Sequence, residues 1–154
     1  MAFEALLAEY EARRAKALAG GGAEKYAKRT AVGIWNARER IAYLVDPGSF
    51  IESGLFGASG IYPEQADATQ TDGKLAGYAR INGRDVCVVV NDFTVKGAST
   101  SATNSKKIAH MKRTATERGT PLVVIALATA SHVAARTEDV GGRRSSCGLP
   151  RGET

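Results

Sequence analysis

The chain has 154 residues, of which 44% are hydrophobic and 24% are charged, and its formal net charge is +5. That apolar content is enough for the core of one ordinary domain. Because no apolar run approaches the roughly 20 residues that span a bilayer and the N-terminus lacks the pattern of a secretory signal, we expect a cytoplasmic protein without a membrane segment.

The two cysteines, Cys87 and Cys147, lie far apart, and neither has a second cysteine or a histidine at metal-ligand spacing. We therefore expect a reduced protein with no disulfide and no metal site. The lysines and arginines are scattered and are not interleaved with aromatic residues, which argues against a nucleic-acid partner. A basic surface equally suits a small anionic molecule that carries phosphate.

The first predicted element is an amphipathic helix over residues 2–19. Its apolar positions recur at helical spacing, and they are Phe3, Leu6, Leu7, Tyr10, Ala17 and Leu18. The three glycines at residues 20–22 end the helix, because glycine readily adopts the conformation that follows a last helical turn.

A second helix is expected to start at Asn36, whose side chain can form a capping box with Glu39. Asp46-Pro47-Gly48 ends this helix. Residues 49–57 then predict a short strand, and residues 58–73 predict a polar loop.

Residues 74–93 predict a β-hairpin around Asn82-Gly83, because both positions of a tight hairpin turn need positive φ. The second strand is apolar on both faces, with Val86, Val88 and Val90 on one side and Cys87 and Val89 on the other. This pattern predicts a central strand. Cys87 is then a small core residue rather than a nucleophile, because apolar burial raises the pKa of a thiol.

A loop over residues 94–104 leads to a predicted helix over 105–118, which Gly119 ends. The inner face of this helix is marked by Ile108, Met111 and Ala115. The strand expected over 121–128 has the apolar run of a strand buried on both faces. The order hairpin, helix, strand predicts a right-handed crossover and an α/β or mixed-sheet architecture.

Few residues have the spacing of a catalytic site. Neither His110 nor His132 has a partner at a meaningful spacing, so a structural or solvent-exposed role is favoured for each. The sequence Gly97-Ala98-Ser99 lies between a buried strand and a helix. There the backbone can approach a ligand closely, and helix-start N–H groups attract anions. The alternative is an ordinary loop and helix cap.

Residues 129–154 differ in composition from the rest of the chain. Their large aliphatic residues are only Val133, Val140 and Leu149, they contain no aromatic residue, and every lysine precedes residue 113. Such a segment buries too little surface to offset its ordering entropy. We therefore expect a disordered tail.

Four segments together resemble the carboxyltransferase (β) subunit of biotin-dependent acyl-CoA carboxylases, the family of propionyl-, acetyl- and methylcrotonyl-CoA carboxylases. They are GGGAEKYAKR (20–29), NARERIAYLVDPGSFIE (36–52), DGKLAGYARINGRDVCVVVNDFTVKGAS (72–99) and KKIAHMKRTATERGTPLVVI (106–125). The joint occurrence of ARERI, DPGSF, INGR and DFTVxG is more specific than any one of these motifs.

The resemblance implies a crotonase-like ββα fold of the ClpP/crotonase type, present as an incomplete N-terminal carboxyltransferase domain over residues 1–128. Within it, residues 1–46 would be a helical segment and residues 49–128 the ββα core. The family moves CO₂ from carboxybiotin to the α-carbon of an acyl-CoA. Backbone N–H groups stabilise the enolate, a role that needs no nucleophilic side chain.

The resemblance also implies the ligands and partners. Biotin would be carried on a partner protein, and coenzyme A would be part of the substrate. Biotin carboxylase and the biotin carrier subunit would be partners, and full-length members form homo-oligomers. Substrate binding would rest on Lys96, Gly97, Ala98 and Ser99, with Lys106 as a second phosphate partner.

The sequence departs from the family after its last strand, where ALATASHVAAR replaces a loop of the Ser-Gly-Gly-Ala-Arg type. No glycine occurs between Gly119 and Gly141, so no catalytic oxyanion residue is assigned and a truncated, inactive piece is expected. The abrupt change predicts that residues from about 127 onward are a frameshifted translation. Alternatives are a non-catalytic remnant that docks onto full-length subunits and an unrelated nucleic-acid-binding protein.

Overall fold

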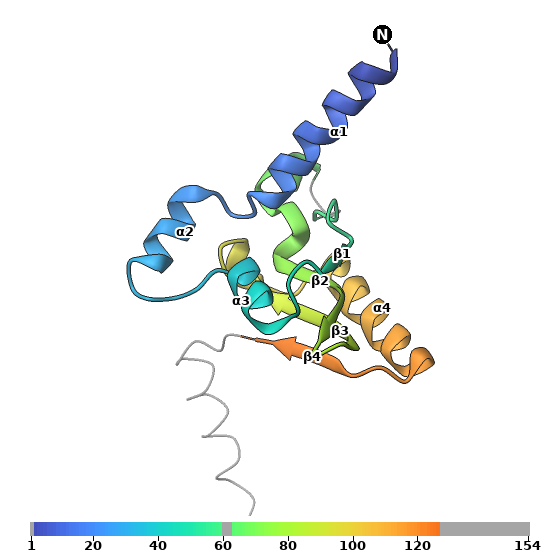
Figure 1. Cartoon of the computed structure of the whole chain (residues 1–154). Helices are drawn as coiled ribbons and strands as arrows, with labels where there is room; N and C mark the ends of the chain where they lie inside the picture. Colours follow the sequence, from blue (N-terminus) through green and yellow to red (C-terminus); the bar gives the residue numbers. More distant parts are fainter. Residues whose placement is uncertain (1, 60–62, 127–154) are drawn as a thin grey trace, which may run out of the picture.

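The computed structural model describes residues 2–59 and 63–126 (Figure 1). Its centre is a four-stranded sheet in the order β1-β2-β3-β4. Antiparallel neighbours are β1 (Ile51–Ser53), β2 (Lys74–Ile81) and β3 (Arg84–Asn91), whereas β4 (Leu122–Ile125) runs parallel to β3. The predicted α/β class with a mixed sheet is confirmed. The tail predicted over 129–154 lies outside the described residues.

Helices lie on both faces of this sheet. On opposite faces are α3 (Ala37–Leu44) and α4 (Ala102–Arg118), whereas α1 (Ala2–Leu18) projects away from the sheet (Figure 1). The remaining helical elements are α2 (Ala23–Thr30) and two 3₁₀ elements, η1 (Pro63–Gly73) and η2 (Lys96–Ala98). No helix among the described residues is long and apolar enough to cross a membrane.

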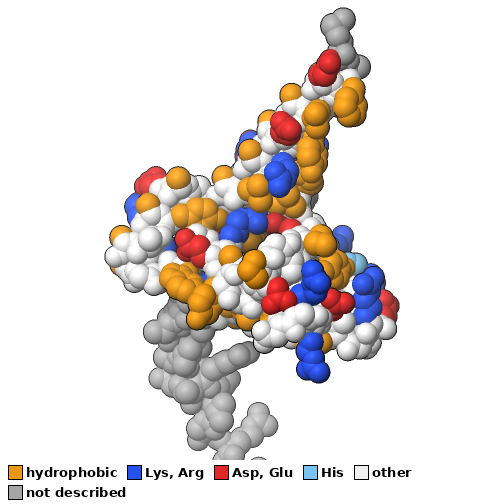
Figure 2. All heavy atoms as spheres, viewed as in Figure 1, with side chains coloured by type: hydrophobic (Ala, Val, Ile, Leu, Met, Phe, Trp, Pro, Cys, Tyr) orange, Lys and Arg blue, Asp and Glu red, His pale blue; other side chains and the backbone are white. Residues whose placement is uncertain are grey.

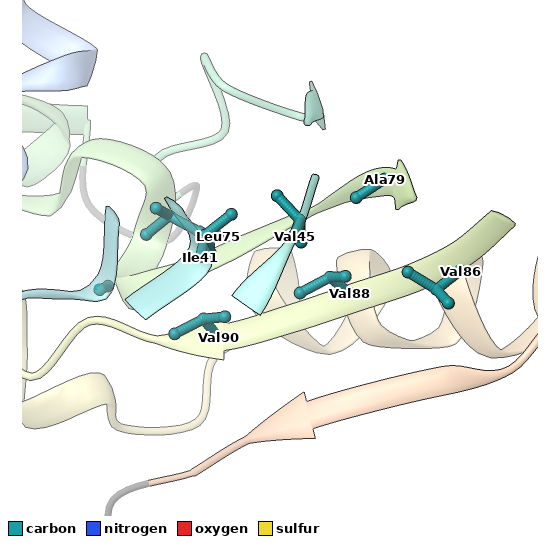
Figure 3. Close-up of a cluster of buried hydrophobic side chains, with 8 residues drawn as sticks. Ile41, Val45, Leu75, Ala79, Val86, Val88 and Val90 are labelled. Atoms are coloured by element: carbon teal, nitrogen blue, oxygen red, sulfur yellow. The ribbon is translucent and has the colours of Figure 1, made fainter. Parts of the chain in front are cut away.

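The alternation of side chains along β3 divides the core into two layers. On the α3 side, Val86, Val88 and Val90 pack with Ile41 and Leu75 (Figure 3). On the α4 side, a second cluster comprises Ala76, Cys87, Val89, Met111 and Ala115. Both faces of β3 are therefore buried, as its pattern predicts, and Cys87 is a core residue with 1% of its surface exposed.

Two short sequence motifs, a helix capping box and a hairpin turn, predicted the positions of structural elements correctly. Asn36 is the N-cap of α3 and forms the predicted capping box with Glu39, whose side chain accepts a 2.8 Å hydrogen bond from the Asn36 N–H. The hairpin turns at Asn82 and Gly83, whose φ angles are 52° and 75°. Both signals depend on interactions within four residues, which explains why they can be read from sequence.

The structure corrects two expectations. Strand β4 is not buried on both faces, because it is the edge of the described sheet and Val124 is 55% exposed. Residues 58–73 are not merely a polar loop, because η1 contains Thr69 and Thr71, both fully buried. Helix α2 lies within the segment over residues 1–46 that was expected to be helical.

Candidate functional site

The loop between β3 and α4 contains three consecutive left-handed residues. The φ angles of Lys96, Gly97 and Ala98 are 44°, 61° and 55°. Only glycine adopts this region at little cost, and each other residue there costs roughly 1 kcal/mol or more. Glycine at position 98 would adopt the same φ without that cost.

Two buried side chains hold the carbonyl groups of this loop. The Lys74 ammonium donates a 3.0 Å hydrogen bond to the carbonyl oxygen of Ala98. The Asn104 amide donates to the carbonyl oxygens of Ser99, at 2.7 Å, and Asp72, at 3.1 Å. The loop conformation is therefore fixed by residues from β2 and α4, although the loop itself lies largely at the surface.

The N-terminus of α4 faces a carboxylate of the same chain. Asp72 accepts hydrogen bonds from the Ser101 hydroxyl and, at 2.9 Å, from the Asn104 N–H. Ser101 also caps the helix through the Asn104 N–H at 3.1 Å. A carboxylate at this position complements the positive end of the helix dipole. An added ligand would therefore share this helix start with Asp72.

Lys107 lies where η1 leads into β2. Its ammonium donates to the carbonyl oxygens of Thr71, at 2.8 Å, and Lys74, at 2.7 Å. Burial lowers the pKa of Lys107 to about 8, while the nearby carboxylates of Glu52 and Asp72 act in the opposite direction. Burial also lowers the pKa of Lys74. Of these two desolvated ammonium groups, that of Lys74 holds the loop, and that of Lys107 holds the backbone where η1 meets β2.

The start of the loop is held by the segment between α1 and α2. Asp92 is 2% exposed and accepts hydrogen bonds from the Tyr26 hydroxyl at 2.9 Å and from both the N–H and the hydroxyl of Thr94, at 2.9 and 2.6 Å. Gly21 donates to the Thr94 hydroxyl at 3.2 Å. Burial, and then the Asp92 charge, raises the pKa of Tyr26 to about 12. The glycine-rich segment and the DFTV motif therefore form one structural unit.

The residues predicted to bind substrate lie in different environments. Lys96 is exposed and contacts the Gln65 side chain, and Gly97 and Ser99 are also exposed. Ala98 is buried. Lys106 is exposed on α4, whereas its neighbour Lys107 points inward. The site assignment itself stays a prediction.

Sequence reasoning missed the residues that support the loop and the adjoining end of η1, which are Asp72, Lys74, Asp92, Asn104 and Lys107. For two of these residues, helical spacing in the sequence could have indicated an inward position. Asn104 and Lys107 share the helical spacing of Met111 and Ala115 on the inner face of α4. A lysine at an inward position of a helix indicates a buried polar contact, because an unpaired ammonium is costly in a core. Within the described residues, no group of three or more His, Cys, Asp or Glu side chains could hold a metal ion.

The sequence is similar to those of known proteins. The sequence matches the carboxyl transferase domain family over residues 28–137. It is 40% identical over 120 residues to the propionyl-CoA carboxylase beta chain of Cereibacter sphaeroides, covering 77% of this chain and 24% of that protein. It is also 36% identical over 113 residues to the methylmalonyl-CoA decarboxylase subunit alpha of Veillonella parvula, covering 72% and 22% of the two chains.

Solved structures show the same likeness. The transcarboxylase 12S hexamer with hydrolysed methylmalonyl-coenzyme A bound matches with a TM-score of 0.71 and 33% identity, over 77% of this chain and 23% of that one. A single-chain, multi-domain long-chain acyl-CoA carboxylase matches with a TM-score of 0.74 and 29% identity, over 94% and 14%. The predicted crotonase-like fold is thereby confirmed for part of such a domain. The chain spans about a quarter of the length of the curated relatives it matches.

Proposed function

The chain belongs to the carboxyl transferase domain family of acyl-CoA carboxylases, and from that premise we propose that its loop after β3 holds the coenzyme A end of an acyl-CoA. In the complete protein, CO₂ would pass from carboxybiotin to the α-carbon of the acyl-CoA, and the proton lost from that carbon would end on the ring nitrogen of biotin that released the CO₂. Biotin would arrive on a carrier partner that biotin carboxylase loads. The acyl group is left open, because relatives act on different acyl-CoA thioesters.

The observation that carries this proposal is the fixed left-handed turn at Lys96, Gly97 and Ala98. Asn104 fixes the carbonyl of Ser99 on the buried side. Because the carbonyl and N–H of a trans peptide point in opposite directions, the N–H of Thr100 is directed away from Asn104. A backbone held in this way can present a donor to an anionic ligand without reorganisation.

Charge supports the same assignment. Lys96 and Lys106 are exposed close to this turn in sequence, and an ammonium group is a suitable partner for the phosphates of coenzyme A. The ammonium groups of Lys74 and Lys107 donate to backbone carbonyls instead. We assign the two exposed lysines to phosphate contact, Lys74 to holding the loop, and Lys107 to holding the backbone where η1 meets β2.

We propose further that this chain alone does not transfer CO₂. The sequence after β4 contains no glycine before Gly141, which lies within the tail over residues 129–154 that is predicted to be frameshifted. An oxyanion loop without glycine loses close backbone approach to the thioester. The alternative, a non-catalytic docking fragment, is favoured by the exposed apolar side of α1. It predicts association without coenzyme A binding.

Calorimetric titration of the full chain with coenzyme A tests the proposal. Coenzyme A should bind, and pantetheine, which lacks the phosphates, should bind more weakly. Lys96→Ala and Lys106→Ala should each weaken coenzyme A binding about threefold to fivefold, the worth of one exposed ion pair. Lys112→Ala, an exposed lysine further along α4, is the matched control. Equal binding of coenzyme A and pantetheine, or no binding of either, would overturn the assignment.

A further inference from the structure

Two half-buried arginines, Arg29 on α2 and Arg40 on α3, are attached to the segment that joins these helices. The carbonyl oxygen of Arg29 accepts a 3.0 Å hydrogen bond from the Ile34 N–H. The carbonyl oxygen of the next residue, Trp35, accepts a 2.6 Å hydrogen bond from the Arg40 guanidinium. Because Ile34 and Trp35 are consecutive, these contacts bring the two arginines close together.

The two guanidinium groups have N–H donors to spare. That of Arg29 lies 5.5 Å from the centre of the Phe93 ring, and no hydrogen bond or ion pair among the described residues involves it. The ring attracts the cation but offers no oxygen acceptor to the five N–H donors of an arginine. Arg40 gives one N–H to the carbonyl of Trp35. Donors of both groups are therefore left for a ligand.

The two cations act on each other. Burial, and then the charge of Arg29, lowers the pKa of Arg40, whereas the carboxylates of Asp92 and Glu39 act in the opposite direction. Those carboxylates accept hydrogen bonds elsewhere, Asp92 from the hydroxyls and N–H described above and Glu39 in its capping box. Within the described residues, neither forms an ion pair with these arginines. A bound anion would relieve the repulsion between the arginines.

An exposed aromatic pair borders the arginines. The rings of Trp35 and Tyr43 meet edge-on with centroids 5.0 Å apart, and the two residues are 50% and 79% exposed. Tyr43 lies three positions after Arg40 on α3, a spacing that makes the two side chains neighbours on the helix. Hydrophobic side chains gather at the surface over α2 and α3 (Figure 2). An exposed aromatic face accepts a stacked base with little regard to which base it is.

We propose that Arg29 and Arg40 bind the phosphates of a nucleotide, either a nucleoside diphosphate or a larger molecule that contains one, and that its base packs against Trp35 and Tyr43. Guanidinium groups match phosphate oxygens with paired N–H donors. An acidic protein segment would also satisfy the arginines, but the adjacent stacking surface favours a nucleotide. The site uses none of the loop residues assigned to coenzyme A above, so it does not rest on that assignment.

Fluorescence titration of the full chain with ADP tests the proposal, because Trp35 is the only tryptophan in the sequence and its emission reports on this site directly. Excitation at the red edge of tryptophan absorption avoids absorption by adenine. ADP should change the Trp35 emission and saturate. Adenosine, which lacks the phosphates, and ribose 5-phosphate, which lacks the base, should each bind at least about tenfold more weakly.

Arg29→Gln and Arg40→Gln should each weaken ADP binding about tenfold, because each removes charge-assisted hydrogen bonds to phosphate. Arg14→Gln, at an exposed position on α1, is the matched control and should bind ADP like the wild type. Circular dichroism shows whether the variants stay folded. Should Arg40→Gln unfold, Arg29→Gln carries the test, because the Arg29 guanidinium makes no hydrogen bond among the described residues.

Two further arms separate the sources of the nucleotide and the two proposals. Coenzyme A should displace ADP if its own nucleotide occupies the site, and should leave ADP bound if the site takes a free nucleotide. Lys96→Ala and Lys106→Ala should leave ADP binding unchanged, whatever they do to coenzyme A. No saturable change with ADP, equal binding of ADP and adenosine, or full ADP binding by Arg29→Gln would overturn the proposal. A glutamate-rich peptide that changes the Trp35 emission when ADP does not would show an acidic protein partner instead.

Discussion

Asp46 holds Gly83, a residue 37 positions further along the chain, through a 2.8 Å hydrogen bond from the Gly83 N–H to its carboxylate. The second oxygen of the same carboxylate accepts a 2.8 Å bond from the Asn82 N–H. The turn that follows α3 is therefore tied to the turn of the β2–β3 hairpin. This contact explains in physical terms why the DPGSF and INGR motifs occur together.

Asp46→Ala should destabilise the chain by about 1–2 kcal/mol, because two charge-assisted hydrogen bonds to backbone N–H groups are lost at a partly solvated site. Urea unfolding measures the change. Asp85→Ala, at an exposed position on β3, should change stability by no more than about 0.5 kcal/mol. Equal effects of the two substitutions would show that the Asp46 contact contributes nothing specific.

Ala98→Gly should stabilise the chain by about 0.5–1 kcal/mol, because φ at this position is 55° and glycine tolerates the left-handed region. Gly97→Ala should destabilise it by about 1 kcal/mol. A side chain at position 97 would meet no atom within 4 Å, so only the backbone conformation is at stake. Thermal unfolding of the two variants should move in opposite directions, and shifts in the same direction would contradict the loop conformation.

Lys107 should make the stability of the chain depend on pH above neutrality. Its folded pKa is about 8, whereas an unfolded lysine titrates near 10.4. Between these values the unfolded chain binds more protons than the folded chain, so the free energy of unfolding rises with pH. Below pH 8 both states are charged, and the burial penalty is felt in full. Urea unfolding at pH 7, 8, 9 and 10 should show this rise.

The Lys107→Met variant should lack most of that rise, while Lys106→Met, at the exposed neighbouring position, should keep it. Any contribution from Lys74, whose pKa is also lowered by burial, remains in both variants. The comparison at each pH therefore isolates Lys107. An identical pH dependence in wild type and Lys107→Met would show that its ammonium is not desolvated in the folded chain.

Gly21→Ala should separate the glycine-rich segment from the DFTV loop, because an added Cβ would overlap the carbonyl and hydroxyl oxygens of Thr94. Tyr26 should then lose its contact with Asp92, and its pKa should fall from about 12 toward the usual value near 10. Ultraviolet titration of tyrosine measures this. Lys28→Ala, at an exposed position on α2, is the control, and it should leave the Tyr26 titration unchanged.

The parts of the fold that could be predicted depend on neighbours in sequence. The Asn36–Glu39 capping box and the Asn82-Gly83 turn are local, and the alternation along β3 places its two faces directly. The burial of β4 was overestimated, because an apolar run indicates that a strand can be covered but not whether a covering segment is present. Val124 is exposed for this reason.

The support of the candidate site could not be predicted in the same way. Lys107 and Asp72 act on backbone groups about 30 positions away in sequence. No periodic pattern joins such residues before the fold is known. The loop itself was found because glycine and small residues between a strand and a helix have a local signature. The left-handed conformation of Lys96 and Ala98 has no such signature.

The most direct test of the central claim is a backbone amide NMR titration of the full chain with coenzyme A. The amides of residues 96–100 and of the first turn of α4 should shift first and most, and the shifts should saturate together. In Gly97→Ala the same shifts should require more ligand. Shifts confined to the separate hollow beside α3, which Arg38, Ile41 and Phe50 help to line, or no shifts at all, would contradict the claim that the loop after β3 contacts coenzyme A.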